Sequence, residues 1–588
     1  MKRIKDKENY IISRSFYGSM GAMIATNIAA FAGSIIDGII ISRMLGGDSM
    51  SAFQLALPVY LIAVLIGVMF ATGLQKRCSY CIGSGDKNEA CSSFTITMIA
   101  LAAISAVFMA LICLFKNGIV STLGAPENLA SEVGGYLLGI VPAIPALILM
   151  MVLSNMIYLT GSKKYVIMGA AAQTVIDIIG DLLNALVFKK GLFGMGLATS
   201  ASYIAAAVIV IVGYRLGKSP IGFKLSSVKK KSFGAVVKAG LPLAVEQLYN
   251  SAQIFILNRI LLAYGDSLSV NVYSILNTIN NLMIPFNMGI GMTAFMMAGV
   301  FYGERDRESL SRLMKTAYRS CVAIETLVVA VVVVASPLIT MMFVSPGQAD
   351  VYNATVAALR IYAVYIPFYG LLYLFQQYFY ATERFLVKYV VSIFTNLISI
   401  CAVAWLLAKR FGANGVWWSF TVSRIAVILA VLAAVFIVLG KRIKEKDAFL
   451  FLPNGFDVGE DRRFNYTVTE PKAISELCAK AEAFCGKHHM NEKRKKHLSL
   501  ILEESCGNIL RWGEGRDKAI DVKIIYDNGW TIRIRDNCKQ FDPKHWFELY
   551  GKDSGTDALG LKIINGLADK IEYSNIIGLN YLKIFINE

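Results

Sequence analysis

The chain has 588 residues, of which 56% are hydrophobic and 17% charged, and its mean hydropathy is +0.55. Soluble domains carry about 25% charged residues, so this composition excludes a protein that lies wholly in water. Residues 447–588 hold 21 basic and 22 acidic side chains, which leaves 37 and 19 for residues 1–446. The basic surplus therefore belongs to the hydrophobic part, as in membrane proteins with basic inner loops, and it does not indicate nucleic-acid binding.

The first 14 residues form a charged N-terminal segment without the features of a cleavable signal peptide. A membrane-crossing helix needs about 20 mostly apolar residues. Twelve such segments follow, near 15–42, 51–73, 91–115, 132–158, 165–188, 195–214, 240–262, 270–300, 318–343, 356–380, 389–408 and 415–439. Because every second loop is rich in Lys and Arg, we expect a multi-pass protein of the inner cell membrane with both termini in the cytoplasm.

The two halves of the hydrophobic part repeat each other around the basic loop 216–238. Gly83 follows the second predicted span, and Gly303 follows the eighth, 220 positions later. The segments that begin at Leu159 and Tyr380 correspond at a similar offset. The sequence therefore predicts two six-helix bundles, 15–215 and 239–440, an arrangement typical of transporters built around a central cavity.

Four acidic residues inside predicted spans are candidates for transport chemistry: Asp37 in the first, Asp177 and Asp181 in the fifth, and Glu246 in the seventh. An ionisable group inside a bilayer is costly and usually marks an ion or proton path. Asp177 and Asp181 are four residues apart and so share one helix face, and Thr199 in the sixth span offers a hydroxyl oxygen. This set suits either H⁺ or Na⁺. The other interpretation of each acid is a buried ion pair with Arg259, Arg360 or Arg424.

Three stretches of the membrane part resemble the MATE (multidrug and toxic compound extrusion) transporters: the run from Ile35 through the second span, AGLPLAVEQLYNSAQIFILN from Ala239, and the acidic segment Gly303–Arg307. The resemblance implies an all-α fold of two bundles that open alternately to either side and exchange Na⁺ or H⁺ for organic cations. It also implies an ion site in the first bundle at Asp37, Asp177, Asp181 and Thr199, and it matches Glu246 to an acid of the second bundle. We expect a monomer.

A basic linker, 441–459, leads to a segment of different composition, 460–588. Helical periodicity predicts helices at 472–487, 493–513 and 560–570. The alternating segments VKIIYD and WTIRIRDN flank Asn528 and Gly529, which indicates a hairpin. A closing strand pair is expected near 570–573 and 579–586. The pattern predicts an α+β sandwich domain large enough for its own core.

This segment resembles the GHKL ATP-binding fold, in particular anti-sigma-factor serine kinase-like domains. The resemblance implies a catalytic role for Glu504, Mg²⁺ binding by Asn508, adenine recognition by Asp536 and close phosphate approach at Gly560, with Mg-ATP as the cofactor. The sequence departs from the family pattern where Cys538, Gln540 and Ala558 replace glycines and where Trp512 replaces a common His. Side chains at glycine positions obstruct phosphates, so nucleotide binding without phosphoryl transfer, or a role as a docking module, stays open.

The sequence thus favours a cation-coupled (H⁺ or Na⁺) antiporter that exports organic cations, with a fused cytoplasmic regulatory domain that resembles nucleotide-binding domains. Whether the tail is also an enzyme is left open. One alternative is a membrane sensor whose tail acts as a serine kinase or docks on a cytoplasmic regulatory protein. Another is a flippase for lipids or polysaccharide intermediates.

Overall fold

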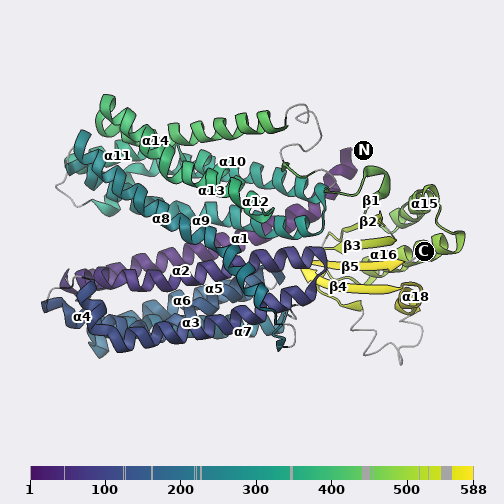
Figure 1. Cartoon of the computed structure of the whole chain (residues 1–588), viewed down its shortest axis with the longest axis horizontal. Helices are drawn as coiled ribbons and strands as arrows, with labels where there is room; N and C mark the ends of the chain where they lie inside the picture. Colours follow the sequence, from purple (N-terminus) through teal and green to yellow (C-terminus); the bar gives the residue numbers. More distant parts are fainter. Residues whose placement is uncertain are drawn as a thin grey trace.

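The computed structural model describes residues 2–45, 47–123, 125, 127–160, 163–217, 219, 221–225, 228–265, 267–344, 349–439, 450–453, 456–515, 517–527, 529–543 and 559–586. Two groups of long helices lie beside each other, and a small α+β domain is attached at one end of them (Figure 1). We call this domain, residues 456–586, the tail domain, and the end of the bundles that it contacts the tail-side end.

In its described residues, the first bundle contains seven α-helices and two short π-helical segments: α1 (Lys2–Ile40), η1 (Ile41–Leu45), α2 (Gly47–Ser84), α3 (Lys87–Thr122), α4 (Glu127–Ile140), α5 (Ala143–Thr160), α6 (Lys164–Leu183), η2 (Asn184–Phe188) and α7 (Gly191–Leu216). The second contains α8 (Lys230–Tyr264), α9 (Ser267–Gly303), α10 (Arg307–Phe343), α11 (Ala349–Ala363), α12 (Ile366–Ala381), α13 (Phe385–Ile393), η4 (Phe394–Ile398) and α14 (Ser399–Leu439).

All twelve predicted spans fall on helical segments. Among the described residues, seven helices are long and apolar enough to cross a membrane, or nine when each of two bent pairs is taken as one span. The bent pairs are α4 with α5 and α11 with α12. The last two predicted spans lie in one helical run that is kinked at Gly412. The φ of 56° at this residue is accessible to glycine but strained for other residues.

Two glycines bring the bundles into backbone contact at the tail-side end. A β-carbon added to Gly83 would lie 2.2 Å from the carbonyl oxygen of Val300, and one added to Gly303 would lie 2.3 Å from that of Tyr80. These are the two glycines that the internal repeat relates. Each is followed by an aspartate, Asp86 or Asp306, whose carboxylate caps the next helix. The repeat therefore places equivalent turns of the two bundles against each other.

The tail domain has one antiparallel sheet in the order β1-β2-β3-β5-β4. Its strands are β1 (Arg463–Val468), β2 (Ile520–Tyr526), β3 (Trp530–Asp536), β4 (Lys570–Ile576) and β5 (Leu579–Ile586), and a 3₁₀ turn, η7 (Glu460–Arg462), precedes β1. The helices are α15 (Lys472–Lys487), α16 (Glu492–Trp512) and α18 (Leu559–Leu567). The predicted helices, hairpin and closing strand pair are confirmed, whereas the edge strand β1 was not anticipated.

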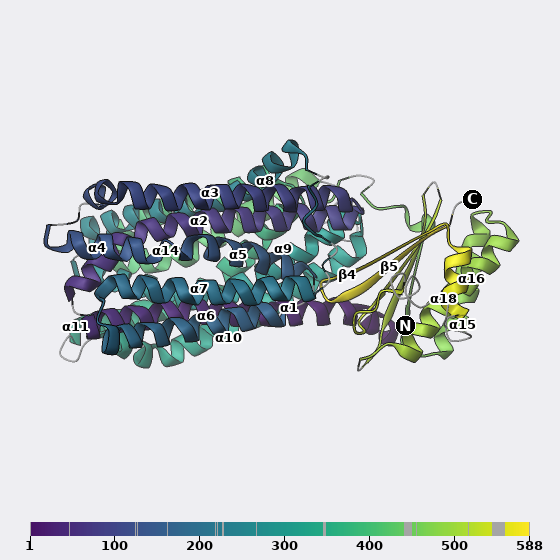
Figure 2. The same ribbon diagram turned by 90° about the horizontal axis from the view of Figure 1, so that it is seen from below.

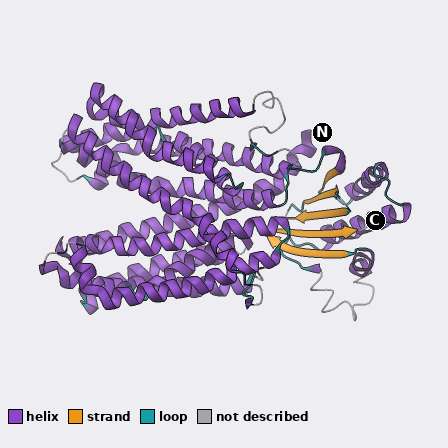
Figure 3. Cartoon of the chain, viewed as in Figure 1, coloured by secondary structure: helices purple, strands orange, loops and turns teal. Residues whose placement is uncertain are grey.

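Strand alternation gives the two faces of this sheet different chemistry. Ile524, Ile532, Ile534 and Ile584 are fully or almost fully buried in one core with α15, α16 and α18. The intervening side chains point the other way, toward the bundles. Figures 2 and 3 show the helices on the far side of the sheet and the strands between them and the bundles. The sheet is therefore covered on both faces.

Candidate functional site

Three acidic side chains predicted to bind an ion come together inside the first bundle. Asp37 lies on α1, and Asp177 and Asp181 lie one turn apart on α6, with exposures of 2% and 1%. The carboxylates interact electrostatically with one another. One oxygen of each, Oδ1, is buried without a hydrogen-bond partner among the described residues. Such oxygens are ready to bind a proton or a cation.

Polar groups from two helices surround Asp177. Gln173, one turn earlier on α6, donates a hydrogen bond of 3.3 Å to its Oδ2. The hydroxyl groups of Thr199 and Ser202 on α7 lie beside this carboxylate and interact with it, and Ser202 Oγ donates to the carbonyl oxygen of Thr199 at 2.8 Å. Thr199 therefore lies where the sequence predicted it, beside the acidic pair. Its hydroxyl adds an oxygen to the candidate site.

Three tyrosines that the sequence analysis did not single out border the acids. Tyr60 on α2 and Tyr203 on α7 join their hydroxyl groups at 2.8 Å. Both interact electrostatically with Asp37 and Asp177, and Tyr136 on α4 interacts with all three acids. Tyrosines are common in such helices, and only the packing of α4 against α2 and α7, and of α7 against α6, shows which of them face the site.

Glu246, the predicted acid of the second bundle, forms an ion pair with a lysine. Lys388 Nζ lies 2.5 Å from Glu246 Oε1, and Ser392 Oγ donates to the same oxygen at 2.8 Å. Lys388 is fully buried on α13, although the sequence pattern placed it with Arg384 in a basic loop between two predicted spans. The described contacts of Glu246 are thus with α13 and not with the acids of the first bundle.

The predicted nucleotide-binding residues of the tail domain lie on the helix side of the sheet. Glu504 and Asn508 share one face of α16, and Gly560 at the start of α18 packs against them. A β-carbon at Gly560 would lie 2.2 Å from Glu504 Oε2 and 2.9 Å from Asn508 Nδ2. The structure therefore brings together three of the four residues, and a methyl group at Gly560 would displace the ends of Glu504 and Asn508.

Asp536, the fourth residue, ends β3 and also faces the helices. Its Oδ1 accepts hydrogen bonds of 2.9 Å from Asn580 Nδ2 and from the backbone N–H of Cys538. Burial raises the pKa of this carboxyl, and those two hydrogen bonds counteract the rise. Cys538 is buried, and its sulfur would lie 2.7 Å from a β-carbon at Gly513. It fills the space after β3 where the related fold has glycine. Ala558 lies outside the described residues.

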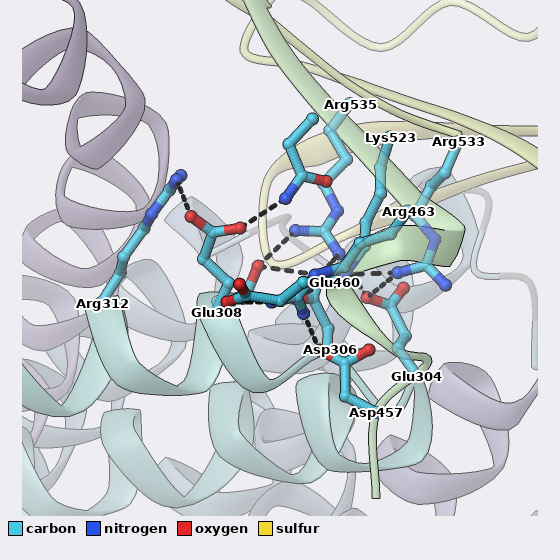
Figure 4. Close-up of polar contacts among 12 residues, drawn as sticks. Glu304, Asp306, Glu308, Arg312, Asp457, Glu460, Arg463, Lys523, Arg533 and Arg535 are labelled. Carbon is cyan, nitrogen blue, oxygen red and sulfur yellow. Dashed lines mark hydrogen bonds and ion pairs between the residues drawn. The ribbon is translucent and has the colours of Figure 1, made fainter. Parts of the chain in front are cut away.

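The other face of the same sheet carries a buried cluster of ion pairs with the second bundle. Glu304 and Asp306, in the turn between α9 and α10, contact Lys523 of β2 and two arginines of β3 (Figure 4). Arg535 Nη2 lies 2.5 Å from Glu304 Oε2 and 2.8 Å from Asp306 Oδ2, and Arg533 Nη1 lies 3.2 Å from Glu304 Oε2. All five side chains are at most 8% exposed.

The cluster keeps Asp306 ionised. Burial alone raises the pKa of Asp306, but Lys523, Arg535 and Arg533 reverse this effect and hold it well below its ordinary value. Asp306 also accepts from the backbone N–H of Ser309 at 3.1 Å, as the cap of α10. The sequence analysis noted the acidic turn as part of the repeat and of the family resemblance, but it did not predict the ion pairs, because the partners are more than 200 residues away in the sequence.

The comparisons with known proteins agree with both parts of the fold. The MatE family model matches residues 22–183 and 242–406, and the model of the histidine kinase-like ATPase domain matches residues 467–581. The multidrug export protein MepA of Staphylococcus saprophyticus is 22% identical over 458 residues, which cover 76% of this chain and 100% of that protein. MepA of Staphylococcus aureus is 23% identical over 446 residues, 74% of this chain and 97% of that protein.

Solved structures share the fold of the two bundles at low sequence identity. A MATE transporter in complex with MaD3S has a TM-score of 0.67 at 18% identity, over 74% of this chain and 97% of the other. A MOP superfamily transporter from Pyrococcus furiosus has a TM-score of 0.64 at 18% identity, over 71% and 94%. Since the family model covers more than half of the chain, this protein belongs to the MatE family and carries a histidine kinase-like ATPase domain after its membrane fold.

Proposed function

We propose that this protein exports organic cations in exchange for H⁺ or Na⁺, by alternating access of its two bundles. The observation that carries the proposal is the convergence of Asp37, Asp177 and Asp181 inside the first bundle, each with a buried oxygen that lacks a hydrogen-bond partner in the described residues. A bound cation or proton would compensate these oxygens. The multidrug export proteins among the relatives support organic compounds as the cargo.

The position of the acids suggests how ion binding is linked to conformation. Asp37 belongs to α1, whereas Asp177 and Asp181 belong to α6. Loading or releasing an ion changes the charge repulsion between these two helices, so the ion binds differently to different packings of α1 on α6. A ligand shifts a conformational equilibrium only through such a difference. Twelve spans with both termini in the cytoplasm are part of the same proposal.

The test is uptake of a lipophilic cation such as ethidium into vesicles that contain the purified protein. An imposed H⁺ or Na⁺ gradient should drive uptake, and the gradient that does so identifies the ion. Asp181→Asn should abolish the dependence on this gradient. Asp350→Asn is the matched control, because Asp350 is an exposed acid at the start of α11. Uptake that ignores both gradients, or equal behaviour of the two variants, would contradict the proposal.

We further propose that the tail domain is a regulatory module that binds Mg-ATP. Asn508 would hold the metal ion, Asp536 the adenine amino group, and Gly560 would leave room for the phosphates beside Glu504. The metal would neutralise phosphate charge there. Buried Cys538, in place of a glycine, weighs against fast phosphoryl transfer. The transporter covers the basic sheet face of the domain, which favours regulation of this chain over docking on another protein.

Calorimetric titration of the full-length protein in detergent with Mg-ATP tests this second proposal. Binding should occur and should be lost in Asn508→Ala. Asn353→Ala, at an exposed position on α11, is the control and should bind as the wild type does. No heat of binding at millimolar Mg-ATP would refute nucleotide binding by the tail domain and leave the transport proposal untouched.

A further inference from the structure

We propose that the tail domain is a latch: its sheet holds the tail-side ends of the two bundles together. A nucleotide bound on the helix side of the sheet controls this latch through strand β3, which carries residues of both sites. The inference rests on the proposed alternating access and deepens the proposed regulation. It follows from where the sheet makes its contacts, from what those contacts are, and from the position of Asp536 relative to Arg535.

The sheet touches both bundles at once. On the second bundle it binds the α9–α10 turn through Glu304 and Asp306, and Arg535 Nη1 also donates to Ser309 Oγ at 2.8 Å. On the first bundle the contacts come from the β4–β5 turn and from β5. The backbone N–H of Ile577 donates to the carbonyl oxygen of Leu159 at 2.9 Å, and Lys583 Nζ donates to that of Gly83 at 3.4 Å.

These contacts are placed where the bundles meet. Gly83 and Gly303 form the close backbone approach between the bundles. The sheet binds Gly83 itself through Lys583, and it binds Glu304, the residue after Gly303. Ser15 of α1 also donates a hydrogen bond to the carbonyl oxygen of Ile577. For the tail-side ends to separate, the sheet must release one bundle. The ion cluster is the contact most sensitive to substitution, because removal of one partner leaves an uncompensated buried charge in the docked state.

The latch and the candidate nucleotide site share β3. Arg533 and Arg535 point from this strand toward the bundles, whereas Asp536, the next residue, points toward α16. The pairing with β5 repeats the arrangement, since Asn580 hydrogen-bonds to Asp536, and the ring of Tyr581 lies with its centroid 5.1 Å from the Arg535 guanidinium. A ligand that moves Asp536 therefore moves the end of β3 that holds Glu304. Such coupling is reciprocal, so the state of the transporter changes nucleotide affinity by the same factor.

Spin labels at Asn88 and Glu503, two exposed residues on α3 and α16, would report docking by their distance in the full-length protein. Arg535→Ala should lower the ratio of docked to undocked molecules at least tenfold and raise the rate of ethidium transport. Arg511→Ala, a surface arginine on α16, is the control. In the double variant with Glu304→Ala, docking should fall no further than in Arg535→Ala, because the two groups form one cluster.

The outcomes separate this inference from the proposed functions. An undocked Arg535→Ala protein that transports no faster than the wild type, or a variant that stays docked, would overturn the latch. Mg-ATP should shift the distance distribution in the wild type and not in Asn508→Ala. Nucleotide binding without any shift in the distance between the labels would show that nucleotide does not control docking through β3. A wild type without gradient-driven transport would instead refute the transport proposal itself.

A second inference is carried by a different observation, a buried acid in the middle of α10. We infer that Glu325 is a proton-carrying site of the second bundle. Its side chain is fully buried, and both carboxylate oxygens lack a hydrogen-bond partner among the described residues. Gly370 on α12 marks the meeting point: a β-carbon there would lie 2.8 Å from Asn287 Oδ1 and 3.1 Å from Glu325 Cγ. Asn287 Oδ1 is likewise buried without a partner.

Among the side chains that the structure describes, no counter-charge forms an ion pair with Glu325. Its electrostatic neighbours are Cys321 on the same helix and Tyr365 and Tyr369 by α12. Arg424 of α14 lies behind those rings, 5.6 Å and 5.9 Å from their centroids. A carboxyl group in such a place is stable with its proton and exchanges it only when the helices rearrange. The site was missed because a single Glu in a Val-rich helix carries no motif.

Proton release on addition of ethidium, followed with a pH dye in weakly buffered detergent solution, tests this site. Glu325→Gln should release about one proton fewer per bound ethidium than the wild type. Asp350→Asn should release as many as the wild type. Thermal melting shows that the variants are folded. Equal proton release by Glu325→Gln and the wild type, or no release by either, would overturn the inference.

Discussion

Replacing Gly303 with alanine should separate the tail-side ends of the two bundles. The new methyl group would lie 2.3 Å from the carbonyl oxygen of Tyr80 and 3.0 Å from the Cα of Gly83. Both are backbone atoms, which cannot rotate out of the way. Overpacking costs about 1–3 kcal/mol, and a backbone-to-backbone contact belongs at the upper end. At about 3 kcal/mol, the closed arrangement should become about 100-fold less populated relative to the separated one.

The assay is the distance between spin labels at Asn88 and Arg305, which lie beside the two equivalent turns. Gly303→Ala should lengthen or broaden this distance. Gly118→Ala is the matched control, because an added β-carbon at Gly118 meets no atom within 4 Å. Both substitutions gain the helix propensity of alanine, so the control removes that effect. If Gly303→Ala gives the same distances as Gly118→Ala, the bundles do not depend on this contact.

Three further results are expected. Lys388→Ala should lower the free energy of unfolding by about 3–5 kcal/mol, because the carboxylate of Glu246 loses its counter-charge. Thermal melting measures this loss, and additional replacement of Glu246 by Gln should recover part of it. Gly560→Ala should abolish Mg-ATP binding by clashing beside Glu504, whereas Gly566→Ala, where a β-carbon has open space, should bind normally. The distance between the labels at Asn88 and Glu503 in the docked protein should stay unchanged from pH 8 to pH 5. The pKa of Asp306 is lowered in the docked state, so its stabilising charge is lost only as the pH falls through values below the ordinary 3.8. Release of the tail domain at pH 5 would contradict this assignment.

Patterns local in the sequence predicted much of the fold. Hydrophobic length located the helices, strand alternation located β2 and β3, and the repeat related Gly83 to Gly303. The edge strand β1, Arg463–Val468, alternates polar and apolar residues but is only six residues long. It was missed because its partner β2 lies far away in the sequence, so no neighbouring strand and turn mark it.

The sites divide in the same way. Asp177 and Asp181 could be assigned to one face because a helix fixes residues four apart. The residues that complete each site come from distant segments. In the sequence, Lys388 looks like a charge of a loop, and nothing marks it as the partner of Glu246. Arg535 looks like one residue of an alternating strand, and nothing marks it as the partner of Glu304. Those pairs depend on how α13 packs on α8 and on how the sheet meets the α9–α10 turn.

The most direct test of the account is whether a substrate gradient can drive the coupling ion uphill through the acids of the first bundle. Vesicles loaded with ethidium and diluted into substrate-free buffer should take up H⁺ or Na⁺ against its gradient when they contain the wild type. Vesicles with Asp181→Asn should still bind ethidium but should accumulate no ion. Ion accumulation by Asp181→Asn at the rate of the wild type would show that the coupling does not pass through Asp37, Asp177 and Asp181.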